Sequence, residues 1–111
     1  MSRNLEVLKR SREIITDPKN WTQYTMARND IGDKTSYDDP RACKFCAMGA
    51  IYKASHEALV CYDPVRAEVK ETLNKRGGPT TWITSFNDSD DRQHSEVLEL
   101  FDETIRRLET T

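Results

Sequence analysis

The chain has 111 residues, of which 32% are charged and 36% hydrophobic. This length fits a single core, and the apolar share argues against a disordered chain. The 17 basic and 19 acidic residues give a formal charge of −2, which excludes a strong positive field over the whole molecule. We therefore expect one domain spanning residues 1–111, with a thin core and no nucleic-acid partner.

The sequence also bears on the compartment in which the protein works. Its apolar runs are too short to cross a bilayer, and its amphipathic, acid-containing start is unlike a signal peptide. The cysteine count of three is odd, and disulfides are not the default in a reducing compartment. We expect a protein of the bacterial cytoplasm, with free thiols, no membrane contact and no cofactor.

The first part of the chain predicts a helix followed by a short β structure. Apolar residues recur at helical spacing over residues 4–16 and predict an amphipathic helix there. Pro18 ends this helix, because a proline disfavours helical geometry at the residue before it. The threonine-containing segment after Trp21, with a polar turn at Gly32, predicts a short strand or hairpin.

A second helix is predicted over residues 40–58. Asp39 can cap free backbone N–H groups, and Pro40 suits the first helical position, where no donor is needed. Apolar residues point in every direction around this helix. A helix that is apolar all round belongs in the interior, so we expect it at the centre of the fold.

The second half of the chain predicts two further helices. Asp63 and Pro64 form the same kind of helix start, and Gly77 or Gly78 ends that helix in a left-handed conformation. The segment 80–88 is either a strand or a helical turn, and a final amphipathic helix contains residues 97–108. The predicted fold is mainly α: a bundle of about four helices around the central one, with a short β-hairpin.

Cysteine and histidine side chains suggest a metal site at first. The four candidate zinc ligands are Cys43, Cys46, His56 and Cys61. In a continuous helix, however, Cys46 and His56 lie about 15 Å apart along the axis and point about 80° apart. We therefore favour no metal and keep a small zinc-binding module as a second alternative.

A cysteine nucleophile is the first alternative. Cys46 could act with His94 as its base, and Asn87 or Asp88 could orient the imidazole, as in thiol hydrolases and transferases. In the predicted helix, Cys46 lies beyond the first turn, where the helix N-terminus lowers a thiol pKa little. The preferred interpretation is a buried thiol that, with Gly49 and Ala50, lets a neighbouring helix pack closely.

Turn residues and aromatic residues point to binding instead. Asn87 and Asp88 are typical of a loop before the last helix, where Asp90 and Gln93 resemble a capping box and His94 lies near the first turn. Loops often carry function, and exposed aromatics mark partner or ligand contacts. The candidate binding residues are Trp21, Tyr24, Trp82, Asn87, Asp88 and His94.

Three fragments together resemble a family of short bacterial and bacteriophage proteins classed as a domain of unknown function. They are "IITDPKNWTQ", "DDPRACKFCAMGAIYKA" and "SFNDSDDRQHSEVLELFDETI". The family pattern falls on Trp21, Thr22, Gln23, Asp39, Pro40, Ala42, Cys46, Gly49, Ala50, Asn87, Asp88, His94, Glu96, Val97 and Leu98. The resemblance implies that Cys46, Asn87, Asp88 and His94 meet in space, and it implies a phage or mobile-element origin. It implies no activity.

These observations favour a non-enzymatic function. We expect a small phage-encoded protein that binds a host or phage protein, or a small ligand, through the surface near Trp21 and the Asn87–Asp88 loop. One form of this hypothesis is an antagonist of a host defence or regulatory protein, which rests on the resemblance and on the size of the chain.

Overall fold

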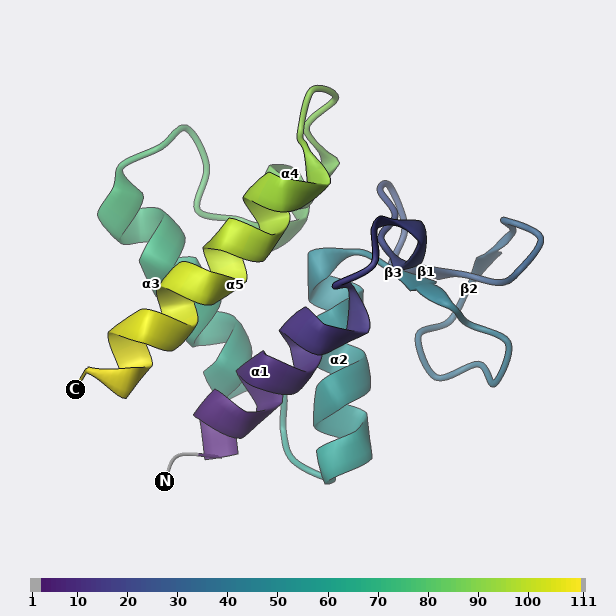
Figure 1. Cartoon of the computed structure of the whole chain (residues 1–111), viewed down its shortest axis with the longest axis horizontal. Helices are drawn as coiled ribbons and strands as arrows, with labels where there is room; N and C mark the ends of the chain where they lie inside the picture. The colour runs from purple at the N-terminus through teal and green to yellow at the C-terminus, as the bar shows by residue number, and fades with distance from the viewer. Residues whose placement is uncertain (1–2, 111) are drawn as a thin grey trace.

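The computed structural model describes residues 3–110, in which a helical body carries a small sheet at one end (Figure 1). The helices are α1 (Arg3–Ile14), α2 (Ala47–Ala58), α3 (Asp63–Arg76), α4 (Ile83–Asp88) and α5 (His94–Glu109). The strands are β1 (Ala27–Arg28), β2 (Lys34–Thr35) and β3 (Lys44–Phe45), and a 3₁₀ turn, η1 (Pro18–Asn20), follows α1. The predicted mainly α class is confirmed.

The core lies between the helices. α1 packs against α2 on one side and α5 on the other, and α3 packs against α5 (Figure 1). α5 buries one stripe at helical spacing, consisting of Val97, Leu100, Phe101 and Thr104. The largest fully buried apolar side chains are Phe101, Leu8, Ile15, Ile51 and Leu100. The periodic apolar pattern of α1, α3 and α5 therefore faces one shared interior.

The predicted hairpin is present and belongs to a three-stranded sheet. β1 and β2 pair antiparallel, with Ala27 opposite Thr35. Gly32 lies in the turn at φ 88°, which a glycine adopts without steric cost, and its N–H donates to the Asn29 carbonyl at 3.0 Å. β3 pairs with the other edge of β1, so the strand order is β2-β1-β3.

The start of the second helix was predicted wrongly. α2 begins at Ala47, because Asp39 and Pro40 form a turn and not a helix cap. One Asp39 carboxylate oxygen accepts from the Arg41 N–H at 2.8 Å and the other from the Thr35 hydroxyl at 2.8 Å. These bonds, the Arg41 N–H bond first, lower the Asp39 pKa.

The later start changes how α2 is buried. Some of the apolar residues that made the predicted helix apolar all round lie before Ala47, in β3 and the loop that precedes it. The buried residues of α2 are Ala47, Gly49, Ala50, Ile51, Ala54 and Ser55. His56 and Glu57 are exposed on the same helix. α2 is thus amphipathic and supports the sheet with its first turn.

The later helix boundaries match the sequence more closely. α3 ends at Arg76, and its C-cap residue Gly77 has the predicted left-handed conformation, with φ 68°. Tyr62 occupies the N-cap position in place of Asp63. The segment left open as strand or helix is helical over Ile83–Asp88. The capping box of α5 consists of Gln93 and Glu96, three residues later in the chain than the predicted pair of Asp90 and Gln93.

Gly49 allows a close backbone contact at the first turn of α2. A Cβ atom at this position would lie 2.0 Å from the Met26 carbonyl oxygen. The same oxygen accepts a hydrogen bond from the Cys46 N–H at 3.2 Å. The role predicted for Gly49 was close approach of a helix; its actual neighbour is the backbone that leads into β1.

Candidate functional site

The Asn87 side chain joins three separate segments of the chain. Asn87 is the second-to-last residue of α4, and its side chain is fully buried. Its Oδ1 accepts from Trp21 Nε1 at 2.7 Å and from the Ala47 N–H at 3.0 Å. Its Nδ2 donates to the Thr22 carbonyl at 3.1 Å and to Asp88 Oδ1 at 2.9 Å. Both lone pairs and both N–H groups are thereby used. We call this cluster the Asn87 hub.

The Trp21-Thr22-Gln23 segment is fixed to the end of α4 by further bonds. The Thr22 N–H donates to the Phe45 carbonyl at 3.0 Å, which places this segment alongside β3. Gln23 Nε2 donates to the carbonyl oxygens of Asn87 and Ser89, each at 2.9 Å. A side-chain amide of each segment thus satisfies polar groups of the other, which is the arrangement expected of a structural junction.

Tyr24 is held in an unusual conformation at the edge of the Asn87 hub. Its φ is 71°, a left-handed value that costs a non-glycine residue energy. Its N–H donates to Asp88 Oδ1 at 2.9 Å, and its phenol donates to Asp90. The bond to Asp90 raises the pKa of the phenol. Tyr24 is 53% exposed, but its N–H and its phenol both bond within the protein.

Cys46 lies at the N-terminus of α2, and the prediction that it lies beyond the first helical turn was wrong. Cys46 is the N-cap residue of α2, and its Sγ accepts a hydrogen bond from the Gly49 N–H at 3.3 Å. Such bonds favour a thiolate, but Cys46 is only 3% exposed. Burial, reinforced by the charge of Asp88, raises the pKa of the thiol to about 11. The thiol is therefore protonated at neutral pH.

His94 is engaged elsewhere. It is the first residue of α5, and its Nε2 lies 2.6 Å from the Ile15 carbonyl oxygen. Because a carbonyl only accepts, this nitrogen carries a proton and donates. The imidazole packs against the Trp21 ring, with 5.8 Å between the ring centroids. Cys46, Asn87 and Asp88 meet at the start of α2, and His94 packs against Trp21, whose indole N–H donates to Asn87.

The four candidate zinc ligands do not converge. Cys46 lies at one end of α2 and His56 near the other, whereas Cys43 and Cys61 are exposed in the segments on either side of that helix. Within residues 3–110, no group of three or more His, Cys, Asp or Glu side chains could hold a metal ion. The Cys61 thiol lies 3.7 Å from an Asp63 carboxylate oxygen.

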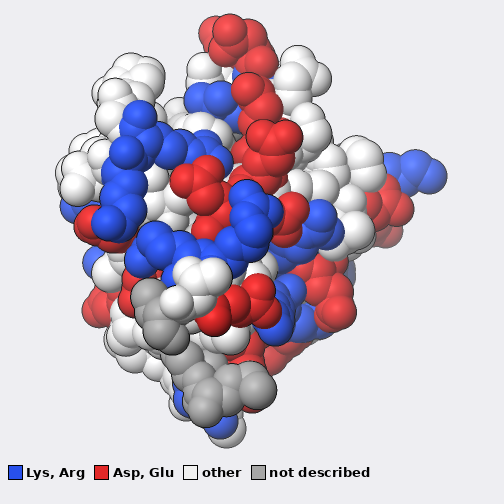
Figure 2. Space-filling view, turned by 60° about the vertical axis from the view of Figure 1, so that its left-hand side comes forward, with Lys and Arg blue, Asp and Glu red and all other residues white. Residues whose placement is uncertain are grey.

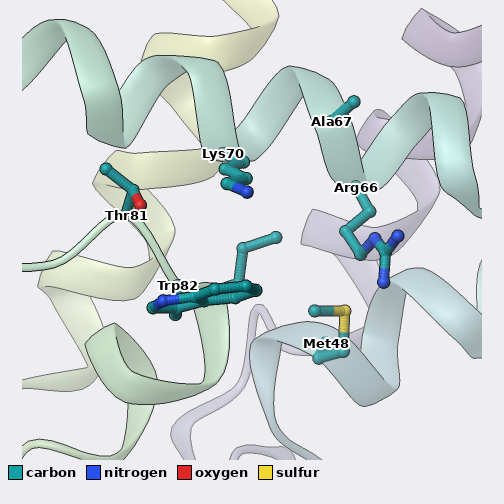
Figure 3. Close-up of a pocket in the computed structure, with 7 residues that line it drawn as sticks. Met48, Arg66, Ala67, Lys70, Thr81 and Trp82 are labelled. Carbon is teal, nitrogen blue, oxygen red and sulfur yellow. The ribbon is translucent and has the colours of Figure 1, made fainter.

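A groove between α3 and the start of α4 has the features of a binding surface. We call it the Trp82 groove; its lining residues are Met48, Arg66, Ala67, Lys70, Thr81, Trp82 and Ile83. Its volume is about 330 Å³, within the range of ligand sites in proteins. Trp82 is 64% exposed. Figure 3 shows Lys70 reaching from α3 toward the flat face of this indole, with Met48 and Arg66 on one side.

The groove combines an apolar floor with positive charge. Lys70 Nζ lies 4.5 Å from the centroid of the Trp82 ring, a cation–π contact. Arg66 forms an ion pair with Asp63 at 3.0 Å, which offsets part of its charge. Lys70 has no ion pair within the described part of the chain. Its charge is therefore the one that an anionic group entering the groove would meet.

The residue type of Trp82 marks it as a candidate in the sequence, whereas its partners in the groove carry no such signal. Arg66 and Lys70 are spaced i, i+4 on the exposed side of α3, a pattern also typical of an ordinary solvated face. Lys70 and Trp82 are separated in the chain by the loop that contains Gly77 and Gly78. Their contact therefore forms only in the tertiary structure. Two further exposed apolar residues, Ile31 (77%) and Leu59 (90%), lie outside the groove.

The molecular surface carries no uniform charge on the face in Figure 2, where basic and acidic side chains are interspersed. No helix within residues 3–110 is long and apolar enough to cross a membrane.

Comparison with known proteins gives a match over nearly the whole chain. A family of unknown function (DUF6197) matches residues 1–107. Neither the curated proteins nor the solved structures include a match. The match therefore assigns no activity to the chain.

Proposed function

The chain belongs to this family of unknown function, and we propose that it is a non-enzymatic binding protein whose docking surface is the Trp82 groove. One observation carries the proposal: a large indole is 64% exposed in a hollow beside the ammonium group of Lys70. Tryptophan is one of the residue types enriched among the energetic anchors of protein interfaces. An exposed tryptophan in a concave, partly apolar site is typical of a surface that a partner covers.

The surface expected from the sequence is less suited to binding. The polar atoms of Asn87 are all used inside the protein, and the Trp21 indole N–H donates to Asn87 at 2.7 Å. A partner at this position would gain no free donor or acceptor from Asn87 and would have to displace internal bonds. We therefore place docking at Trp82 and assign the Asn87 hub to stability.

The chemistry of Cys46 argues against the enzyme alternative. With a pKa of about 11 the thiolate fraction at pH 8 is roughly one in a thousand. The His94 nitrogen that would act as base is bonded to the Ile15 carbonyl. Iodoacetamide labelling tests this: Cys43 and Cys61 should be alkylated in the folded protein, and Cys46 only after denaturation. Rapid alkylation of Cys46 in the folded protein would revive the enzyme hypothesis.

The biological role that we propose is suggested by the family resemblance. A phage-encoded protein of the bacterial cytoplasm that binds a host defence or regulatory protein would need no catalytic site and only one adequate docking surface. The Trp82 groove supplies such a surface. This form rests on size and resemblance, and the geometry supports only the binding step.

Affinity capture from bacterial lysate tests the docking surface. The wild-type chain and Trp82→Ala are compared with Ile31→Ala, which removes another exposed apolar side chain, outside the groove. We expect a partner that is retained by wild type and Ile31→Ala and lost by Trp82→Ala, with all three proteins equally folded by circular dichroism. A partner that all three capture equally would place docking elsewhere.

A further inference from the structure

The Trp82 groove continues into a second hollow along α3. This hollow has a volume of about 390 Å³, and its lining residues are Ala67, Lys70, Glu71, Asn74 and Thr81. Three of them, Ala67, Lys70 and Thr81, also line the Trp82 groove. The two hollows therefore adjoin, and the Lys70 side chain lies at the border between them.

The combined channel is elongated. Arg66, Lys70 and Asn74 are spaced i, i+4, i+8, so they form one stripe along α3 that spans about 12 Å. An extended polypeptide covers about 13 Å with four residues. The segment containing Thr81 and Trp82 forms the opposite wall. A channel of this length between a helix and a loop segment fits a short extended chain better than a compact ligand.

The charges differ along the channel. At one end, Arg66 lies beside the apolar surface of Trp82, Met48 and Ile83, and Lys70 adjoins this surface at the border of the two hollows. At the other end Glu71 lines the wall and would repel an anion, although Lys75 lies 3.9 Å from its carboxylate. A negative group is thus favoured more strongly next to the apolar end, where Arg66 and Lys70 line the wall, than at the far end, where Glu71 offsets the charge of Lys70.

From this geometry we infer that the occupant is an extended segment of a partner protein, in which a large apolar side chain has an acidic residue next to it. The apolar side chain packs on Trp82, and the adjacent carboxylate pairs with Lys70. When the carboxylate binds, the Lys70 ammonium can leave the indole face to meet it. This inference rests on the proposed function, because it names the chemistry of the partner that the Trp82 groove would bind.

Short labelled peptides test the chemistry directly. The probe is a fluorescein-labelled hexapeptide with a central Asp-Phe-Asp sequence between glycines. The matched peptides carry Asn-Phe-Asn, which removes only the charge, and Asp-Ala-Asp, which removes only the anchor. Binding is followed by fluorescence anisotropy at low salt, and amide shifts in ¹⁵N spectra locate the peptide on the protein.

Two protein variants complete the design. Lys70→Gln removes the proposed cation, and Lys34→Gln makes the same change on β2, where Lys34 is exposed outside the channel. We expect Asp-Phe-Asp to bind at least tenfold more tightly than either matched peptide, with shifts confined to residues 66–74 and 81–83. Lys70→Gln should abolish the preference for acidic over amide peptide, and Lys34→Gln should leave it unchanged.

The possible outcomes separate this inference from the proposed function. Equal binding of Asp-Phe-Asp and Asn-Phe-Asn at Trp82 would overturn the acidic partner and leave the docking surface intact. Absence of binding by every peptide at millimolar concentration would overturn the extended segment, whereas the capture experiment with Trp82→Ala still decides the surface. Tighter binding of a free aromatic carboxylate such as phenylacetate than of any peptide would make the occupant a small molecule and would also overturn the inference.

Discussion

Replacing Asn87 with alanine should destabilise the protein severely. The change removes the acceptor of the Ala47 N–H (3.0 Å) and of Trp21 Nε1 (2.7 Å), and the donor to the Thr22 carbonyl (3.1 Å). A buried polar group left without a partner costs about 1–3 kcal/mol. Ala47 is fully buried, whereas Trp21 and Thr22 are half-buried and can recover part of their loss from water. We expect the free energy of unfolding to fall by about 4 kcal/mol.

Urea denaturation followed by far-UV circular dichroism measures this loss, and a thermal scan should show a melting temperature about 15–20 °C lower. Asn74→Ala is the matched control, because Asn74 is an exposed asparagine near the end of α3; it should change the free energy of unfolding by less than about 0.5 kcal/mol. A loss below about 1 kcal/mol for Asn87→Ala would refute the argument that the Asn87 hub holds the fold together.

Three further changes test separate parts of the structure. Gly49→Ala places a Cβ atom 2.0 Å from the Met26 carbonyl oxygen, so the free energy of unfolding should fall by about 2–3 kcal/mol in urea denaturation; an unchanged value would contradict the close contact. The raised pKa of Cys46, about 11 against 9.0 for the unfolded thiol, means that the unfolded state loses its proton first. The contribution of this thiol to the free energy of unfolding is thus fully present below pH 9 and is lost as the pH rises toward 11. Stability curves should therefore fall more steeply over this interval for wild type than for Cys46→Ser, and parallel curves would contradict the burial argument. Trp82→Ala should leave the free energy of unfolding within about 1 kcal/mol, since the indole is 64% exposed; a larger loss in the same assay would show that Trp82 serves the core.

Much of the helical fold follows from local patterns. The apolar stripes of α1, α3 and α5 face one interior, so their spacing predicts them without knowledge of their neighbours. The start of α2 was mispredicted because an Asp-Pro pair suits both a helix cap and a turn. The turn is favoured here because the Thr35 hydroxyl and the Arg41 N–H donate hydrogen bonds to the Asp39 carboxylate. β3 depends on pairing with β1, a contact between segments far apart in sequence.

The candidate site was harder to predict than the fold. An asparagine and an aspartate in a loop are typical of both binding sites and turns, and only burial distinguishes the two. Asn87 receives its bonds from residues about 40 and 66 positions away, which no local pattern indicates. Trp82 was identified by its residue type, but its neighbour Lys70 is indistinguishable in sequence from other helix-surface lysines. The groove therefore emerges only when α3 and α4 are placed together.

The most direct test of the whole account uses the two tryptophans as reporters. The chain has two tryptophans, one in the Asn87 hub and one in the Trp82 groove, so a ¹H–¹⁵N spectrum contains two indole N–H signals. Addition of the captured partner should shift or broaden the Trp82 signal and leave the hydrogen-bonded Trp21 signal in place. A shift of the Trp21 signal with an unchanged Trp82 signal would contradict the assignment of binding to the groove and of stability to the hub.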